Sequence, residues 1–292
     1  MDKQPGYIRK PDWLKIKLGN NDIFSSTERI IENQQLCTIC RSGRCPNLGE
    51  CWSKGTATFM IAGEICTRSC KFCNTKTGKP LPLDPGEPGK IADSVQQLDL
   101  KHVVITSVDR DDLPDYGAHH WAETIRRIKE NNPGTTIEVL IPDFNANPVL
   151  LDLIIQSMPD IISHNIETTK RLTPLVRSIA QYDTSLQVIE YIASSGTPAK
   201  SGLMLGLGET KGEVLLLMDD LLAAGCRLVS IGQYLQPSRN NISVKEYIHP
   251  DVFKELKQIA MDKGFAHVES GPLVRSSYHS IDFLFNFCKT IR

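Results

Sequence analysis

The distribution of cysteines is the feature that most restricts how this chain can fold. Seven of its nine cysteines lie between residues 37 and 73. Their number is odd and their spacings suit metal ligands, which argues against a framework of disulfides and fits a reducing compartment. We therefore expect the N-terminal part of the chain to fold around metal.

The tightest group is Cys66-x3-Cys70-x2-Cys73, three thiols on one loop. No histidine stands nearby to complete a tetrahedral zinc site. A [4Fe–4S] cluster normally takes four thiolates, so three cysteines would leave one iron open to a small molecule. The alternative is a structural zinc knuckle that takes its fourth ligand from elsewhere in the chain.

A second group, Cys40-x4-Cys45-x5-Cys51, again offers three thiols. Glycine and proline stand between them, and these loop residues allow the thiols to converge on one point. Cys37 lies three positions before Cys40 and has no place in the three-cysteine pattern. With the other three it could form a closed four-thiolate site for zinc or a cluster.

Beyond Thr56, short β-branched runs alternate with helical stretches. We expect six strands, at residues 56–62, 102–108, 135–141, 161–167, 200–207 and 227–235. Asn147 before Pro148 predicts a helix start, and Thr210 with Glu213 predicts a capping box. This alternation indicates a parallel sheet, either curved into a barrel or doubly wound.

Polar residues gather where the expected strands end. In parallel α/β folds these carboxyl ends form a single mouth that carries the chemistry. The polar and glycine residues at these positions are Thr106, Ser107 and Asp109, Asn165 and Glu167, Gly206, Gly208 and Glu209, and Gln233 and Gln236.

The loop of Cys66, Cys70 and Cys73, with Phe72 before its last cysteine, resembles the signature of the radical S-adenosylmethionine superfamily. Within it, the chain is similar to the lipoyl synthases. That family carries C-x4-C-x5-C ahead of C-x3-C-x2-C and ends in R-S-S-Y, which stands here at residues 275–278. The order of these motifs argues against two other sulfur-inserting enzymes, the biotin synthases and the methylthiotransferases. A different class, a non-catalytic iron–sulfur or zinc protein, stays open.

The resemblance implies an α/β fold: a partial six-unit (β/α) barrel of the radical S-adenosylmethionine type with N-terminal and C-terminal cluster-binding extensions. Residues 1–55 would form the extension that carries the auxiliary-cluster cysteines. Residues 56–264 would form the barrel, and residues 265–292 a C-terminal segment with the R-S-S-Y turn.

The resemblance also implies that Cys66, Cys70 and Cys73 hold a [4Fe–4S] cluster whose open iron binds S-adenosylmethionine. Reduction then yields a 5′-deoxyadenosyl radical, which removes hydrogen from an unactivated alkyl carbon. Ribose hydroxyls and the methionine amino and carboxylate groups need polar or charged contacts. The candidates for these contacts are Ser107, Asp109, Asn165, Glu167 and Arg177. For Glu167 and Arg177 a structural ion pair at the barrel rim is the alternative.

A second [4Fe–4S] cluster would be held by Cys40, Cys45 and Cys51, and the resemblance implies that a serine of the R-S-S-Y turn supplies the fourth ligand. We expect this serine to be Ser277. Oxygen is harder than thiolate and a poorer match for cluster iron, so it should leave more easily. That suits a cluster that is dismantled to give up its sulfur. The alternative for Ser276 and Ser277 is an ordinary turn or helix cap.

The implied reaction inserts two sulfur atoms at carbons 6 and 8 of an octanoyl chain that is amide-linked to a lysine of a carrier protein. The implied carriers are the glycine cleavage H protein and the E2 lipoyl domains of 2-oxo acid dehydrogenases. An electron donor such as flavodoxin or ferredoxin and an iron–sulfur cluster carrier would also be partners.

The net charge of −1 argues against a general nucleic-acid binder. The opening of the chain is polar and contains no apolar core of signal-peptide length, so it indicates neither a secretory nor a membrane segment. We expect a cytoplasmic protein.

Overall fold

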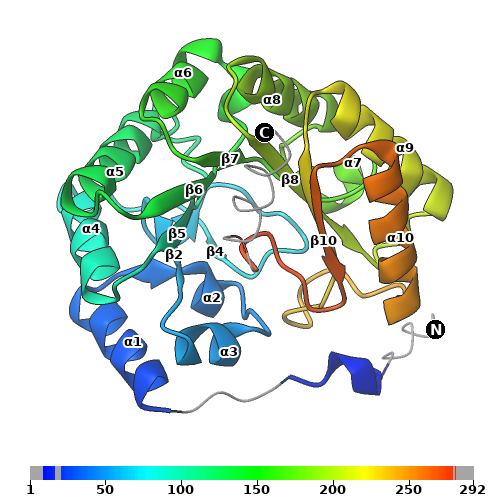
Figure 1. The fold of residues 1–292 in the computed structure, drawn as a ribbon, viewed down its shortest axis with the longest axis horizontal. Coiled ribbons are helices and arrows are strands. Elements are labelled where there is room, and N and C mark those ends of the chain that lie inside the picture. Colours follow the sequence, from blue (N-terminus) through cyan, green and yellow to red (C-terminus); the bar gives the residue numbers. More distant parts are fainter. Residues whose placement is uncertain (1–8, 17–20, 279, 281–292) are drawn as a thin grey trace.

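A parallel β-sheet curves around the centre of the molecule (Figure 1). The computed structural model describes residues 9–16, 21–278 and 280. The strand order is β1-β2-β5-β6-β7-β8-β9-β10, and β1 alone pairs antiparallel to its neighbour. The strands are β1 (Cys37–Thr38), β2 (Thr58–Ile61), β5 (His102–Ser107), β6 (Thr136–Leu140), β7 (Ile161–Ser163), β8 (Ala199–Leu205), β9 (Leu228–Gln233) and β10 (His267–Gly271).

Helices connect successive strands along the outside of the curved sheet, as right-handed βα crossovers require (Figure 1). They are α4 (Glu87–Gln97), α5 (Ala118–Asn131), α6 (Pro148–Gln156), α8 (Tyr182–Ser194), α9 (Lys211–Ala223) and α10 (Pro250–Lys263), with the short α7 (Thr173–Val176) after β7. Among the described residues before the barrel, the α-helices are α1 (Asp22–Asn33), α2 (Ile39–Ser42) and α3 (Leu48–Ser53). The arrangement confirms the expected partial barrel.

All six strands expected from the sequence are present, and two further strands extend the sheet. The two-residue β1 is too short to leave a periodic pattern. The sequence of β10, HVESG, contains too few apolar residues to read as a buried strand. Because β1 belongs to residues 1–55 and β10 to residues 265–292, both extensions contribute an edge strand to the barrel sheet.

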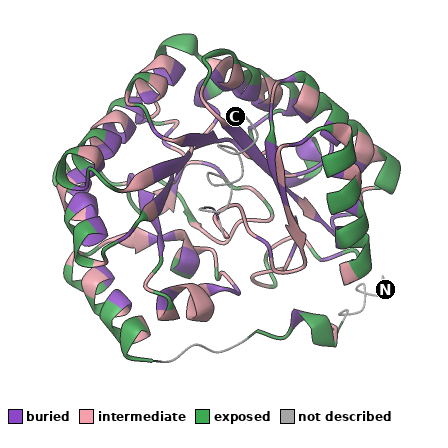
Figure 2. Cartoon of the chain, viewed as in Figure 1, coloured by how far each residue is buried: buried purple, intermediate pink, exposed green. Residues whose placement is uncertain are grey.

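The core lies between the sheet and its outer helices, where buried residues follow the strands and the inward helix faces (Figure 2). All four residues of β2 are buried, as expected for a strand covered on both faces. On α5, Trp121, Ile125 and Ile128 lie on one face and are buried, whereas the opposite face is charged. Within the described residues, no helix has the length and apolar character needed to cross a bilayer.

The predicted helix ends are confirmed. The side chain of Asn147 accepts a hydrogen bond from the backbone N–H of Val149 at 3.0 Å, directly before α6. Thr210 and Glu213 form both bonds of a capping box at the start of α9. These caps satisfy N–H groups that have no partner inside the helix.

The cap at Asn147 gives a stability prediction. Asn147→Ala should lower the free energy of unfolding by about 1 kcal/mol, because one helix N–H loses its acceptor. Asn147→Asp keeps an acceptor and should stay within a few tenths of a kcal/mol of the parent. Chemical denaturation of both variants measures the difference. Equal stability of the alanine variant and the parent would contradict this role.

Candidate active site

The two cysteine groups meet at a cavity at the carboxyl ends of the strands. This first cavity has a volume of about 340 Å³, and its wall contains Cys66, Cys70 and Cys73 together with Cys40 and Cys45. Residues that are distant in sequence therefore face one space, as the single mouth of the barrel predicts.

A second cavity of about 400 Å³ shares lining residues with the first at the N-terminal cysteines. Cys40, Cys45 and Cys51 all line it. Arg275 and Ser277 line both cavities, as do Cys40 and Cys45. The R-S-S-Y turn thus reaches back to the mouth of the barrel, and Ser277 stands in the wall that the two cavities share.

Short helices place the N-terminal thiols. Cys40 lies in α2, and Thr38 caps this helix, because its hydroxyl accepts from the backbone N–H of Arg41 at 3.4 Å. Cys45 follows a sharp turn in which Arg44 has a φ of 49°, and Cys51 lies in α3. Within this segment, local backbone geometry turns the three thiols toward one region.

The other cysteine loop is tied to its neighbours by backbone contacts. Asn74 donates to the carbonyl of Ser42 at 2.9 Å and so joins the two cysteine segments. Asn241 donates to the carbonyl of Cys73 at 2.7 Å. The backbone N–H of Lys71 donates to the carbonyl of Val176 at 2.8 Å. The loop is therefore held on both sides.

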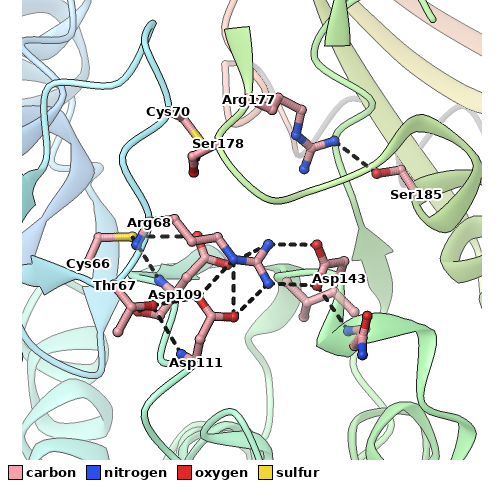
Figure 3. Close-up of polar contacts among 12 residues, drawn as sticks. Cys66, Thr67, Arg68, Cys70, Asp109, Asp111, Asp143, Arg177, Ser178 and Ser185 are labelled. Atoms are coloured by element: carbon pink, nitrogen blue, oxygen red, sulfur yellow. Dashed lines mark hydrogen bonds and ion pairs between the residues drawn. The ribbon is translucent and has the colours of Figure 1, made fainter. Parts of the chain in front are cut away.

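Arg68, between Cys66 and Cys70, anchors this loop to the barrel (Figure 3). Its side chain is 5% exposed and contacts Asp111 at 2.8 Å and Asp143 at 2.6 Å, with Asp109 at 3.4 Å. The bonds to Asp111 and to Asp143 are both bidentate. Asp109 and Asp111 follow β5 and Asp143 follows β6, so one guanidinium binds the loop to two strand ends.

Burial and charge oppose each other in this cluster of carboxylates. Burial would raise the pKa of Asp143, but the hydrogen bonds and charge of Arg68 outweigh it and lower the pKa to about 2. For Asp109 burial is the larger effect, and it raises the pKa despite the nearby guanidinium. Arg68 therefore binds carboxyl groups whose pKa values are shifted in opposite directions.

The thiols lie in surroundings that disfavour the free thiolate. Burial raises the pKa of Cys66 to about 12, and Asp109 adds to the shift. Burial also raises the pKa of Cys51 to about 12, with further contributions from Cys40 and Cys45. Binding of iron must therefore release protons from these thiols, and the positive charge of the metal would offset the cost of burying thiolates.

The cysteines do not form a compact site for a single ion in the described part of the chain. Among residues 9–16, 21–278 and 280, no three or more cysteine, histidine or acidic side chains lie close enough together to hold a single metal ion. Cys37 packs instead with Met60 and Val108 and lines neither cavity. Three thiols spread around a cavity suit a cubane, which is wider than one ion.

All five candidate contacts for S-adenosylmethionine line the first cavity: Ser107, Asp109, Asn165, Glu167 and Arg177. Asn165 donates to Glu167 at 3.1 Å. Arg177 donates instead to Ser185 at 2.9 Å (Figure 3). Burial raises the pKa of Glu167, and the charge of Arg177 opposes that shift.

Two buried polar atoms beside the first cavity are left without a partner among the described residues. They are Oδ1 of Asn165 and Nε of Arg177. Buried polar atoms are nearly always hydrogen-bonded, so an unpaired acceptor and an unpaired donor at one cavity suit a polar ligand. The residues present therefore fit a ligand with both amino and carboxylate groups.

Comparison with known proteins identifies the family. The model of the radical SAM superfamily matches residues 60–221. The lipoyl synthase of Parabacteroides distasonis is 63% identical over 94% of this chain and 98% of its own length. The lipoyl synthase of Treponema denticola is 60% identical over 93% of this chain and 94% of its own. The chain belongs to the lipoyl synthase family. Membership implies S-adenosylmethionine and iron–sulfur chemistry.

Solved structures show the fold at low sequence identity. The hydrogenase maturase HydG of Carboxydothermus hydrogenoformans has a TM-score of 0.58 at 13% identity and covers 90% of this chain and 78% of that one. Methylornithine synthase has a TM-score of 0.57 at 12% identity and covers 83% and 68%. Both similarities are similarities of fold, in the partial barrel.

Sequence reasoning did not find Arg68, Asp143 or Ser276. Asp143 comes directly after a strand, so the rule that located Ser107 and Asp109 could have found it. Arg68 lies between two predicted ligands, but nothing in the sequence shows that it is buried. Nothing local in the sequence shows that Ser276 is bonded, because its partners Asn165 and Lys200 lie far away in the chain.

The contacts of Arg68 with its three carboxylates predict the effect of a conservative exchange. Arg68→Lys keeps the charge but cannot bind two carboxylates bidentately, so the Cys66–Cys73 loop should lose its anchor. We expect reconstituted protein to hold roughly half the iron of the parent, because the N-terminal cysteines keep theirs. Iron and sulfide analysis after anaerobic reconstitution tests this. Arg126→Lys, in an exposed ion pair, is the control. A full iron content in Arg68→Lys would rule out the anchoring role.

The low pKa of Asp143 predicts a dependence of stability on pH. A carboxyl whose pKa falls to about 2 on folding stabilises the native state above its unfolded value near 4, and this contribution disappears as the pH falls toward 2. The stability difference between the parent and Asp143→Asn should therefore be largest above about pH 4 and shrink below it. Denaturation of the apoproteins between pH 2 and 7 measures it. A constant difference would contradict the assignment.

Proposed function

We propose that this chain makes the lipoyl cofactor by inserting two sulfur atoms at carbons 6 and 8 of an octanoyl chain linked to a lysine of a lipoyl carrier protein. Membership of the lipoyl synthase family supports the reaction. The observation that carries the mechanism is the shared wall: two sets of three cysteines border adjoining cavities, with Ser277 between them.

At the first cavity, Cys66, Cys70 and Cys73 would hold a [4Fe–4S] cluster. When bound and reduced, this cluster with S-adenosylmethionine supplies a 5′-deoxyadenosyl radical that removes hydrogen from an alkyl carbon. Arg177 would bind the carboxylate of the methionine, and Asn165 and Glu167 would bind its amino group or the ribose. Ser107 and Asp109 would complete the contacts. The residues of the chain would thus bind and orient S-adenosylmethionine and exclude water from it.

At the second cavity, Cys40, Cys45 and Cys51 would hold another [4Fe–4S] cluster, with Ser277 as its fourth ligand. Sulfur for the product would come from sulfide held at this site. A hydroxyl ligand suits this use, because oxygen binds cluster iron less well than thiolate and leaves it more readily. The position of Ser277 next to the first cavity supports the assignment.

The wall of the first cavity can also receive an alkyl chain. Leu140, Met204 and Val274 line it beside the polar groups. An octanoyl chain loses contact with water in such surroundings and needs no polar partner along its length. Its carbons would then lie in a space that both groups of cysteines border.

The wider proposals follow the family. The carriers would be the glycine cleavage H protein and E2 lipoyl domains, with flavodoxin or ferredoxin as electron donor, an iron–sulfur cluster carrier, and a cytoplasmic location. Residues 1–55 would carry the auxiliary cysteines, residues 56–264 would form the barrel, and residues 265–292 would form a C-terminal segment that contains the R-S-S-Y turn. A bond from Asn47 to the carbonyl of Leu273 at 2.8 Å supports joint action of the two extensions.

The test of this function is the mass of an octanoyl-lysine carrier domain after anaerobic incubation with reconstituted protein, S-adenosylmethionine and a reductant. The parent should add two sulfurs. Ser277→Ala should still form 5′-deoxyadenosine but insert sulfur about 10- to 100-fold more slowly, because one ligand is lost. Ser194→Ala, an exposed serine on α8, is the control.

Three outcomes would count against parts of the proposal. Insertion by Ser277→Ala at the parent rate would remove Ser277 from the site. An unchanged octanoyl group, with 5′-deoxyadenosine formed by the parent, would overturn the substrate. No consumption of S-adenosylmethionine under strong reductant would favour a non-catalytic iron–sulfur protein.

A further inference from the structure

The segment that carries Ser277 returns from β10 to the middle of the barrel in two consecutive turns (Figure 1). The N–H of Val274 donates to the carbonyl of Gly271 at 3.1 Å, and the N–H of Tyr278 donates to that of Arg275 at 2.9 Å. We call residues 274–278 the serine turn. Two short turns do not by themselves fix where a serine side chain points, so contacts with the sheet must do so.

One such contact holds the backbone of the serine turn. Nζ of Lys200, on β8, donates to the carbonyl of Ser276 at 2.7 Å. The same ammonium binds both carboxylate oxygens of Glu138, at 2.9 and 3.0 Å, and the two side chains are 1% and 0% exposed. A buried ion pair is a weak source of stability compared with apolar packing. Here it directs a charged donor at the residue before Ser277.

A second contact holds a side chain of the turn. Nδ2 of Asn165, which follows β7, donates to the hydroxyl of Ser276 at 2.7 Å. Gly202 on β8 makes room for this pair. A Cβ atom at that position would lie 2.8 Å from Oδ1 of Asn165 and 3.1 Å from Oγ of Ser276. The missing side chain lets the amide and the hydroxyl meet over the strand.

A third contact brings the turn against β9. A Cβ atom at Gly232 would lie 2.2 Å from the carbonyl oxygen of Val274 and 3.2 Å from its carbonyl carbon. Real Cβ atoms do not approach backbone that closely. Gly232 and Gly202 thus leave a shallow seat on neighbouring strands, and the serine turn fills it.

We propose that Lys200, Asn165, Gly202 and Gly232 are positioning residues that place Ser277 in the wall shared by the two cavities. The proposal rests on the role of Ser277 as the fourth ligand of the auxiliary cluster. A hydroxyl is a poor ligand for cluster iron, so its binding depends on being held in place beforehand rather than on the strength of the bond. The seat supplies that placement from strands of the barrel.

The experiment compares variants that disturb the seat but leave every proposed ligand intact. Gly232→Ala pushes the backbone at Val274 away, and Ser276→Ala removes one hydroxyl. Lys200→Met combined with Glu138→Met removes the donor to the carbonyl without stranding a buried charge. Each is reconstituted as the holoprotein with iron-57. The Mössbauer signal of the oxygen-bound iron and the rate of iron release to a chelator are then measured.

We expect all three changes to weaken the oxygen-bound signal and to speed iron release from the auxiliary cluster. Ser276→Ala should speed release roughly fivefold, the effect of one lost hydrogen bond, and Gly232→Ala by more. Ser276→Thr keeps the hydroxyl and should restore the signal. Gly89→Ala, in α4 with open space around it, is the control. Circular dichroism checks that each variant is folded. If Gly232→Ala does not fold, the signal and the iron release of Ser276→Ala decide whether the seat positions Ser277.

The Ser277→Ala variant distinguishes this proposal from the ligand assignment of Ser277 on which it rests. If Ser277→Ala loses the oxygen-bound signal and the seat variants lose it too, the seat is supported. If Ser277→Ala loses the signal but the folded seat variants keep it, the seat is refuted while the ligand assignment stands. If Ser277→Ala keeps the signal, the ligand assignment falls, and the seat falls with it.

Discussion

The burial of Arg68 among three carboxylates is the interaction on which the candidate active site depends. A guanidinium that is 5% exposed requires partners on several sides, and Asp109, Asp111 and Asp143 provide them from the ends of β5 and β6. Because Arg68 lies between Cys66 and Cys70, the same bonds that satisfy its charge place the cysteine loop over the barrel mouth. Displacement of this loop would leave buried charges unpaired, which would lower the free energy of unfolding.

A second buried charge serves the other end of the chain in a comparable way. Lys200 is paired with Glu138 inside the barrel, and it also donates to the carbonyl of Ser276. In both cases a cation satisfied by carboxylates also fixes a loop that carries proposed ligands. The barrel strands therefore act as a rigid frame, and charged side chains connect the functional segments to it.

The sequence predicted much of this arrangement, for identifiable reasons. The six inner strands and the caps at Asn147 and Thr210 follow from local patterns of β-branched residues and capping side chains, and the structure confirms them. Motif spacing led to the two groups of three cysteines, and all six border the cavities. The strand β10 and the contacts of Ser276 were not predictable, because they depend on pairing between residues tens of positions apart. The two glycines of the seat leave no local signal either.

This division between local and long-range placement bears on the chemistry of the second cavity. Cys40, Cys45 and Cys51 are placed by α2, α3 and the turn between them, with one further bond from Asn47 to the carbonyl of Leu273. Ser277 is placed by contacts with β7, β8 and β9 through its neighbours. The three thiols thus depend mainly on local helices, whereas Ser277 depends on contacts with the barrel sheet. In the proposed chemistry, the weakly bound hydroxyl ligand therefore has a support that is separate from that of the three thiolates.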